Sequence, residues 1–430
     1  MKNTVHCSLL LLTLASGSFS QSAVAQSGWT RQSSGTANLL TGVSFTDANT
    51  GWAVGDSGTI LHTTNAGTTW SSQSSGTRNN LQAVCFTDPN TGTAVGLRGT
   101  IIHTTNGGAN WMVQSSGTAN DLLGVSFTDA NTGTAVGGRV DEATILHTTN
   151  GGATWTSQPS GITTYLTGVS FLDAENGTAV GQGGTILHTT NGGAIWVSQS
   201  NWTPFDLYAV SFTDANTETA VGAEDLLGDG TILRTTNGGA TWATHTHGIV
   251  QSLPNNLNGV CFSDANTGWV IGSSGNYGAI LHTTNGGATW VYSTDPVSYP
   301  LSSIFFTDAK TGWVVGDSGT ILHTSTGGEA DVNERPQTPK EITSVRNYPN
   351  PFASSTTISY ILPRSDMISL VIYNEAGEAI ATLMHQEQTA GMHTVIFNAA
   401  NLPDGFYFYR LNAYSDQSIS MCGTMAYRGE

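Results

Sequence analysis

Histidine recurs at one position of a repeated phrase in this chain, which raises the question of a metal site. The copies are His62, His103, His147, His188, His282 and His323, and Arg234 takes the same place in a seventh copy. Ligand atoms must lie about 2 Å from the ion that they share. Histidines one repeat apart belong to separate structural units and cannot meet that distance. We predict that each packs against the tryptophan that ends its own copy of the phrase and forms hydrogen bonds there.

Two further patterns carry atoms that metals bind. His245 and His247 fall on one side of an expected strand, but no third ligand accompanies them. The turn Asp47-x-Asn49-x-Gly51, which recurs at Asp129 and Asp264, offers oxygens to calcium. Each copy supplies one carboxylate, whereas calcium takes about six to eight oxygens. A simple turn is the better interpretation, and we expect no metal and no cofactor.

The elements that position these residues come from a phrase that is repeated seven times. It reads roughly L-x-G-V-S-F-T-D-A-N-T-G-x-A-V-G-x-x-G-T-I-L-H-T-T-N-G-G-A-T-W. Each complete copy holds four short β-rich runs separated by Gly, Asn and Asp turns, a pattern typical of strands joined in hairpins. We name these strands A to D. The period is that of one four-stranded propeller blade, because such units must stack to bury their apolar faces.

The ends of the repeat region predict how the ring closes. The seventh copy stops at Gly328 without a strand D. Residues 27–36 resemble the strand D of residues 69–77 but have no strands A to C before them. The surplus strand fits the missing one, and closure leaves no blade interface unpaired. We therefore predict an all-β fold whose main part is a seven-bladed β-propeller closed by an N-terminal strand.

The turn between strands C and D carries a family resemblance. It reads Thr63-x-Asn65-x-Gly67-x-Thr69-Trp70 and resembles the Asp-box, with Asn in place of Asp. The wider phrase over residues 27–328 resembles the propeller of the photosystem II assembly and stability factors. Other Asp-box propellers include sialidases, xyloglucanases and sortilin-type receptors, so function must be argued from the site.

A glycoside hydrolase would need further groups. A sialidase-like site requires three arginines around the axis and a Tyr–Glu pair, and a xyloglucanase-like site requires two facing carboxylates. None of the propeller's arginines falls on an expected inner strand A, and repeated turns account for almost every aspartate. No Ser–His–Asp order, phosphate loop or dinucleotide loop is present. We predict a non-enzymatic protein, with a glycoside hydrolase that uses the variable-loop face described below as the alternative.

A second pattern begins at Asn347-Tyr348-Pro349-Asn350-Pro351-Phe352 and continues through Gly391-Met392-His393 to residues 402–411. It resembles the C-terminal sorting domain of the type IX secretion system. The resemblance implies a small Ig-like β-sandwich over residues 344–430 and a partner in the secretion machinery. Residues 329–343 are polar and contain proline, which is typical of a linker.

The N-terminus and the charge limit where the protein acts. Residues 1–26 combine Lys2, an apolar run from Leu9 to Leu14 and the sequence Ala23-Val24-Ala25, as in a signal peptide. No segment is long enough to span a membrane. The net charge is −17 with 13 Lys and Arg, which disfavours nucleic acid and anionic membrane surfaces as partners. We predict a monomer that is secreted or held on the outer cell surface after crossing both membranes.

Loop length varies at two of the four connections in the unit. Extra residues enter the B–C turn (139–143, 223–230 and 273–277) and the D–A connection (201–208, 245–258 and 292–300). These two connections open on one face of a propeller, and a variable face on a constant scaffold is the expected binding face. Drift in loop length without function remains the alternative. We predict that this face binds a protein or glycan through Arg78, Arg98, Arg139, Trp202, Phe205, Tyr208, Asp225, Asp229, Tyr277, Tyr292 and Tyr299.

Three tryptophans form a separate aromatic pattern. Trp52, Trp269 and Trp313 stand where other copies have threonine, in units that would be adjacent in the ring. An aromatic binding arc is one interpretation. Because they begin strand B beside a constant turn, we predict that they pack in the core instead.

Overall fold

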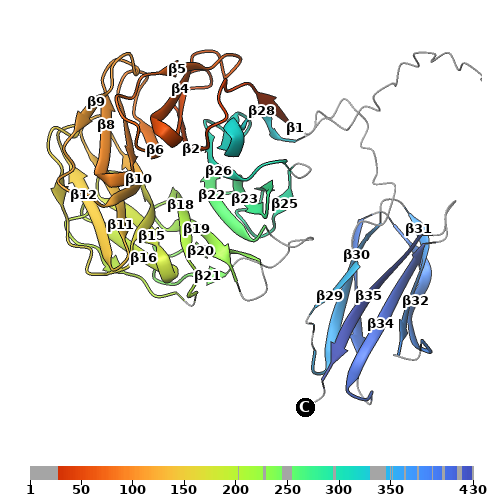
Figure 1. The fold of residues 1–430 in the computed structure, drawn as a ribbon. Helices are drawn as coiled ribbons and strands as arrows, with labels where there is room; N and C mark the ends of the chain where they lie inside the picture. The colour runs from red at the N-terminus through yellow and green to blue at the C-terminus, as the bar shows by residue number, and fades with distance from the viewer. Residues whose placement is uncertain are drawn as a thin grey trace, which may run out of the picture.

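A computed structural model of the chain describes residues 28–201, 203–225, 229–244, 254–293, 297–329, 345–348, 350, 352–362, 365–374, 377–389, 391–399, 402–413 and 419–428. The regular elements of these residues are strands and single 3₁₀ turns (Figure 1). The predicted signal peptide, Trp202, His245, His247 and nearly all of the predicted linker lie outside the described residues.

The described residues between 28 and 329 form seven antiparallel four-stranded sheets, which we number by the order of their strands A. Sheet 1 contains β2 (Leu40–Phe45), β3 (Gly51–Gly55), β4 (Thr59–Thr63) and β5 (Ser71–Gln73) as strands A to D. The same order is repeated in sheets 2 to 6. Sheet 2 contains β6 (Leu81–Phe86), β7 (Gly92–Gly96), β8 (Thr100–Thr104) and β9 (Met112–Gln114), and sheet 3 contains β10 (Asp121–Phe127), β11 (Gly133–Arg139), β12 (Glu142–Thr148) and β13 (Thr156–Ser157). Sheet 4 contains β14 (Leu166–Phe171), β15 (Asn176–Gly181), β16 (Thr185–Thr190) and β17 (Val197–Ser198), sheet 5 contains β18 (Leu207–Asp214), β19 (Thr217–Glu224), β20 (Gly230–Thr235) and β21 (Ala243–Thr244), and sheet 6 contains β22 (Asn256–Phe262), β23 (Gly268–Ser274), β24 (Tyr277–Thr283) and β25 (Val291–Tyr292).

Sheet 7 joins the two ends of the repeat region. It contains β26 (Leu301–Phe306), β27 (Gly312–Gly316) and β28 (Ile321–Gly328), and its outer strand is β1 (Gly28–Gln32). Thr30 pairs with His323 and Gln32 with Ile321, so β1 supplies the missing strand D as the sequence predicts. Strands A of successive sheets contact one another in a closed cycle, and β26 lies against β2.

Hydrogen bonds tie neighbouring sheets together at the outer strands. In sheets 1 to 5 the tryptophan of the C–D turn donates its Nε1 hydrogen to a glutamine in or directly after strand D of the preceding sheet, whereas Trp290 Nε1 of sheet 6 is buried without a hydrogen-bond partner. Trp70 donates to Gln32 at 3.1 Å, Trp111 donates to Gln73 at 3.2 Å, and Trp155, Trp196 and Trp242 repeat the contact. These bonds satisfy an indole group that is otherwise packed against apolar side chains.

The connections fall on two faces. The C–D turn binds the A–B turn, as in the 2.9 Å bond from the Gly107 nitrogen to the Asn90 carbonyl, and we name this side the short-turn face. The B–C turn binds the D–A connection, as in the 2.9 Å bond from the Ser57 nitrogen to Asn80 Oδ1. We name this side the long-loop face, because it carries the insertions that the sequence shows.

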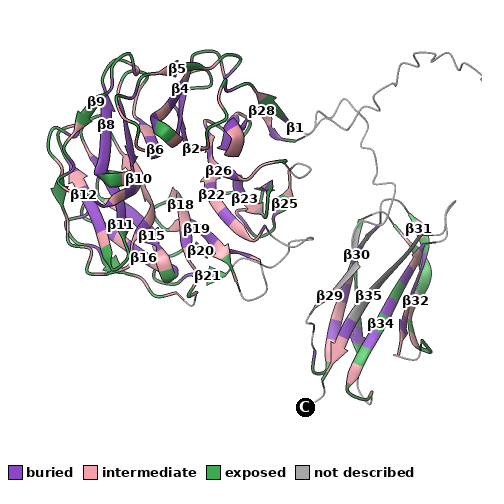
Figure 2. Cartoon of the chain, viewed as in Figure 1, coloured by how far each residue is buried: buried purple, intermediate pink, exposed green. Residues whose placement is uncertain are grey.

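Residues 345–428 fold into two sheets that share one core. One contains β29 (Val345–Tyr348), β30 (Ser355–Leu362) and β33 (Gly391–Asn398); the other contains β32 (Ala379–Gln388), β31 (Asp366–Tyr373), β34 (Gly405–Ala413) and β35 (Ile419–Tyr427). Ile358 and Tyr360 of the first sheet and Leu370, Tyr409 and Leu411 of the second are buried together. Figure 2 shows buried residues along the strands of both parts of the chain, and exposed residues in the connections and on outer strands such as β32.

Candidate functional site

The six repeated histidines lie in their own sheets, each on strand C. In sheets 2 to 4 the Nδ1 atom lies 2.9–3.1 Å from a threonine hydroxyl of strand B, as in His188 with Thr178. In sheets 1, 6 and 7 the ring lies against the strand B tryptophan, as in His62 with Trp52. Burial lowers the pKa of all six imidazoles. Packing is confirmed for all six, and hydrogen bonding for the three in sheets 2 to 4, whereas Nε2 of His62, His282 and His323 is buried without a hydrogen-bond partner. The partner is the strand B residue and not the C–D turn tryptophan that we expected.

The strand B tryptophans are core residues. Trp52, Trp269 and Trp313 have no exposed surface. Each indole stacks, at a ring-centroid distance of 3.5 Å, on the strand A phenylalanine of the next sheet (Phe86, Phe306 and Phe45). Because a binding arc must reach solvent, the packing prediction is confirmed and the arc is excluded.

The repeated aspartates serve their own turns. Asp47 Oδ1 accepts hydrogen bonds from the backbone nitrogens of Asn49 at 2.6 Å and Thr50 at 2.9 Å. These bonds favour the ionised form and hold the pKa of Asp47 below its usual value. Asp88, Asp129, Asp173, Asp264 and Asp308 make the same contacts. The turn interpretation is confirmed. Among the described residues, no group of three or more His, Cys, Asp or Glu side chains could hold a metal ion.

The three predicted arginines all lie exposed on the long-loop face, in connections of consecutive sheets. Arg78 belongs to the connection between sheets 1 and 2. Arg98 lies in the 3₁₀ turn η2 (Leu97–Gly99) with φ 59°, a left-handed value that Gly183 adopts in sheet 4. Arg139 ends β11 and pairs with Glu142, with 2.6 Å between Nη2 and Oε2. Keeping arginine at a left-handed position costs roughly 1 kcal/mol of backbone strain.

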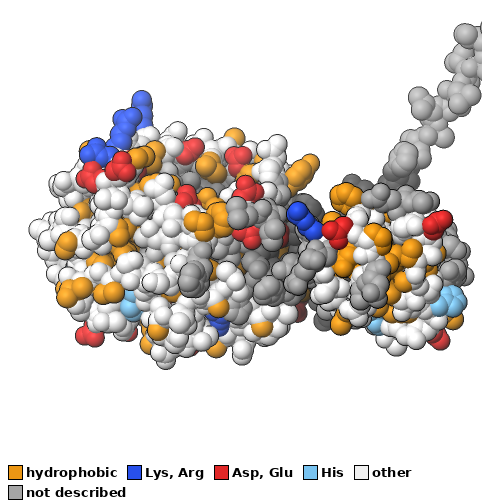
Figure 3. Space-filling view, turned by 90° about the horizontal axis from the view of Figure 1, so that it is seen from below, with side chains coloured by type: hydrophobic (Ala, Val, Ile, Leu, Met, Phe, Trp, Pro, Cys, Tyr) orange, Lys and Arg blue, Asp and Glu red, His pale blue; other side chains and the backbone are white. Residues whose placement is uncertain are grey.

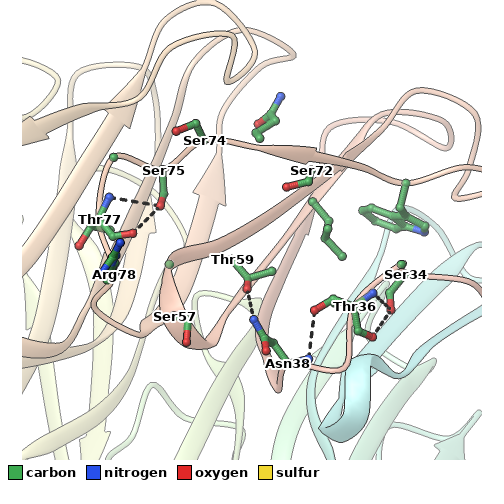
Figure 4. Close-up of a pocket in the computed structure, with 16 residues that line it drawn as sticks. Ser34, Thr36, Asn38, Ser57, Thr59, Ser72, Ser74, Ser75, Thr77 and Arg78 are labelled. Carbon is green, nitrogen blue, oxygen red and sulfur yellow. Dashed lines mark hydrogen bonds between the residues drawn. The ribbon is translucent and has the colours of Figure 1, made fainter.

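A polar groove adjoins Arg78. It has a volume of about 750 Å3 and lies between the connection that follows β1 and the connection that follows β5. Figure 4 shows the hydroxyls of Ser57, Thr59, Ser72 and Ser74 along it. Ser75 and Asn38 are already used by their own loops, because Ser75 bonds the Thr77 carbonyl and Asn38 bonds Thr59. The lining can donate and accept hydrogen bonds, and Arg78 can neutralise an anion.

The aromatic and acidic residues predicted for this face belong mainly to sheets 5 and 6. Phe205 and Tyr208 are half-buried at the start of sheet 5, and Tyr277 is 60% exposed at the tip of the β23–β24 hairpin. Asp225 and Asp229 close a loop through a 2.7 Å backbone bond. Tyr299 lies under the Arg31 guanidinium, 5.6 Å from Cζ to the ring centroid. Tyr292 differs from the prediction, because it lies within strand β25 and packs against the core of sheets 5 and 6.

Charge on the long-loop face is mixed. Arg98 neighbours Asp121, which accepts a bond from the Arg98 backbone nitrogen at 2.8 Å, and Arg139 is paired with Glu142. Sheet 5 brings Asp206, Glu224, Asp225 and Asp229 to the same face. Figure 3 shows a group of basic side chains that projects at the upper left, and acidic side chains spread along the same upper edge. Acidic side chains therefore lie beside the arginines as well as on sheet 5.

Sequence reasoning missed one ionisable residue. Glu218 on β19 has no exposed surface, and neither of its carboxylate oxygens has a hydrogen-bond partner. His188 Nδ1 lies 3.8 Å from its Oε1. The signal was present in the sequence, because Glu218 stands where the other six copies have glycine.

The fold and the repeated turns define a β-propeller of the Asp-box kind, followed by a separate β-domain. Residues 21–116, 111–256, 199–294 and 249–353 match the family described as photosynthesis system II assembly factor YCF48, and the chain belongs to that family. Residues 346–421 match the secretion system C-terminal sorting domain. This type IX sorting domain marks the protein for export to the cell surface or beyond. No helix of the described residues is long and apolar enough to cross a membrane.

Solved structures with similar folds include two YCF48 proteins and one enzyme. "YCF48 bound to D1 peptide" is 20% identical, with a TM-score of 0.56, over 71% of this chain and 99% of that one. YCF48 from Cyanidioschyzon merolae is 21% identical, with a TM-score of 0.54, over 69% and 98%. The Niastella koreensis GH74 enzyme is 14% identical, with a TM-score of 0.54, over 91% and 74%. At these identities the likeness shows the fold. No curated protein matches the chain.

Proposed function

We propose that this protein is an exported, non-enzymatic binding protein whose long-loop face holds an extracellular polypeptide. The observation that carries the proposal is the contrast between its two faces. The short-turn face repeats one turn whose aspartates are hydrogen-bonded to their own backbone, whereas the long-loop face varies from sheet to sheet. Arg78, Arg98 and Arg139 are exposed there. A polypeptide ligand is also supported by the related YCF48 structure, which is bound to a peptide.

The proposed domain division follows the sequence. Residues 1–26 form a signal peptide, residues 27–328 a closed seven-bladed propeller, residues 329–343 a linker and residues 344–430 an Ig-like sorting domain that is recognised by the secretion machinery. The closed cycle of inner strands and the pairing of β1 with β28 support the seven-bladed ring. Two sheets around one core support the sandwich. We propose that the exported protein acts as a monomer.

Binding to charged peptides tests the assignment of the face. The exported protein is applied to arrays of short acidic, neutral and basic synthetic peptides, with a glycan array run in parallel. We expect Arg78→Ala with Arg98→Ala to weaken binding of the best peptide about tenfold or more, and Tyr277→Ala to weaken it by a similar factor. Lys310→Ala is the matched control, since Lys310 is an exposed cation on the short-turn face. Equal losses in the control, binding to glycans alone, or turnover of a glycan would contradict the proposal.

Deleting residues 344–430 tests the export step separately. The sorting domain has its own core, so the propeller should remain folded after the deletion. We expect the shortened protein to accumulate in the periplasm, measured by cell fractionation and circular dichroism. Arrival of the shortened protein at the surface would contradict the sorting role without affecting the binding proposal.

A further inference from the structure

The interface between sheets 4 and 5 contains a carboxylate that the repeat does not require. The strand B residue that pairs with the strand A phenylalanine is glycine in six sheets, and an added Cβ there would lie 2.4–2.6 Å from the phenylalanine ring. That ring therefore occupies the space over the glycine. In sheet 5 the residue is Glu218, and a Phe212 ring cannot occupy the same space.

Packing around Glu218 differs accordingly. In the other six sheets the strand A phenylalanine meets the turn or closing tryptophan edge to face, as Phe171 meets Trp196 at 5.9 Å. Phe212 and Trp242, which the structure describes, do not make this ring contact. Sheet 5 has thus exchanged an aromatic contact for a buried acid, which normally costs stability. Such an exchange is typical of a functional position.

Among the residues that the structure describes, one ionisable side chain, His188, lies within 4 Å of this acid. His188 Nδ1 lies 3.8 Å from Glu218 Oε1 and 2.9 Å from the Thr178 hydroxyl. Burial raises the pKa of Glu218 to about 7, with the Thr178 hydroxyl opposing the rise. Burial also lowers the pKa of His188. The two groups can therefore both be uncharged just below neutral pH, and Glu218 ionises as the pH rises further.

The other charges near sheet 5 do not compensate Glu218. Arg234 on β20 donates to Thr219 at 3.0 Å and lies over the Phe262 ring of sheet 6. Because Thr219 follows Glu218 in the strand, the two side chains leave opposite faces of the sheet. Burial lowers the pKa of Arg234, and the Asp214 carboxylate, at the end of β18, opposes this lowering. Thr235, which pairs with Glu218 on the neighbouring strand, is uncharged.

Solvent reaches His188 of this pair. A cavity of about 410 Å3 is lined by His188, Ile195, Val197 and Gln199, together with Thr190 and Asn191. The His188 side chain is 13% exposed, whereas Glu218 has no exposed surface. His188 therefore lies between bulk water and the buried carboxylate, where it can pass a proton to and from Glu218.

We propose that Glu218 and His188 form a proton-sensitive contact, which keeps sheets 4 and 5 together while Glu218 is protonated and loosens their interface when Glu218 ionises. An unpaired buried carboxylate must gain water or a partner, and partial separation of the two sheets supplies water. Strands β18 and β19 run from this interface to the long-loop face, where Tyr208 and Glu224 lie. If that face binds a ligand as proposed above, the affinity for the ligand also changes with the protonation of Glu218.

Hydrogen exchange of the exported full chain, followed by mass spectrometry from pH 5 to pH 8, tests the contact without any ligand. After correction for the chemical exchange rate, we expect exchange in β16, β18 and β19 to rise severalfold between about pH 5 and pH 7 and then to level off. Glu218→Gln should remove this pH response. Glu218→Gly, which restores the residue of the other repeats, should remove it as well and gives a second variant if Glu218→Gln does not fold.

A matched histidine pair locates the effect. His147 in sheet 3 makes the same contact with Thr134, but Gly177 stands across its interface. His188→Gln should shift the pH of the response, and His147→Gln should leave it unchanged. The proposal fails if the wild type shows no pH response, if Glu218→Gln behaves like the wild type, or if the interface between sheets 3 and 4 responds equally. None of these outcomes depends on whether the long-loop face binds a peptide.

Discussion

Two interfaces of the ring show how one repeat is filled in different ways. Between sheets 7 and 1, Trp313 is fully buried and stacks on Phe45 with 3.5 Å between ring centroids. Between sheets 4 and 5, Thr178 stands in place of the tryptophan and is hydrogen-bonded to His188, and Glu218 stands in place of the glycine. The order of the strands is the same on both sides, although β18 and β19 have an additional register shift between Phe212 and Asp214. The repeat therefore fixes the backbone, while single side chains decide how tightly each interface holds and whether it responds to pH.

The difference follows from what each side chain removes from water. A fully buried indole contributes several kcal/mol through apolar area and ring stacking. A buried carboxylate without a hydrogen bond opposes folding once it ionises. The interface between sheets 7 and 1, which also joins the ends of the ring, is thus expected to be the more stable of the two.

Removal of residues 27–36 should produce the largest effect and break the stronger side of the ring. β1 would be lost, and with it the strand pairing of β28 and the buried Trp29 that packs on Phe306. We expect a loss of about 5 kcal/mol or more in the free energy of unfolding, measured by urea denaturation. An unchanged midpoint would show that the ring does not depend on β1.

Truncation of the two strand B residues compares the interfaces directly. Trp313→Ala should lower the free energy of unfolding by about 4 kcal/mol, because it leaves a cavity against Phe45. Thr178→Ala should lower it by about 1 kcal/mol, the usual cost of one neutral hydrogen bond. Similar losses for both variants in chemical denaturation would mean that the tryptophan does not distinguish the interfaces.

Glu218→Gln should strengthen the weaker interface in a pH-dependent way. The pKa of Glu218 rises from 4.5 to about 7 on folding. Between these pH values the folded state keeps a proton that the unfolded state has lost, so the free energy of unfolding falls as the pH rises. Above pH 7 the substitution should raise the free energy of unfolding by about 3 kcal/mol, and near pH 4 it should change little. Glu142→Gln on an exposed hairpin is the control and should show no comparable gain.

Substitutions of the turn aspartates, Asp47→Ala and its counterpart in sheet 5, should have the smallest effects, since this turn is common to both sides of the ring. We expect a loss of about 1 kcal/mol at pH 7, because Asp47 accepts two backbone hydrogen bonds. The pKa of Asp47 is lowered on folding, so its contribution should disappear as the pH falls through that lowered value. Asp214→Ala is the matched variant in sheet 5. Asp214 accepts one such bond, from Asn216, and thermal melts should show a smaller loss for it.

Much of the candidate site could be placed from the sequence, because the repeat assigns each loop residue to a known connection. Arg78, Arg98, Arg139 and Tyr277 lie on the predicted face for this reason. Tyr292 was misplaced because strand D ends later in sheet 6 than the turn signals indicated. The sequence did not predict two contacts of these arginines, because local loop geometry decides them. Arg139 pairs with Glu142, and the Arg98 backbone nitrogen donates to Asp121.

The sequence by itself determined the repeat, the four strands of each unit, the closing role of residues 27–36 and the sorting domain. It could do so because turn residues and alternating apolar positions act locally and recur seven times. Tertiary structure decided which side chains meet across the interfaces. Trp52 reaches the phenylalanine of the next sheet and Glu218 reaches His188 of the preceding one. Such contacts join residues far apart in the chain, and packing in three dimensions is what brings them together.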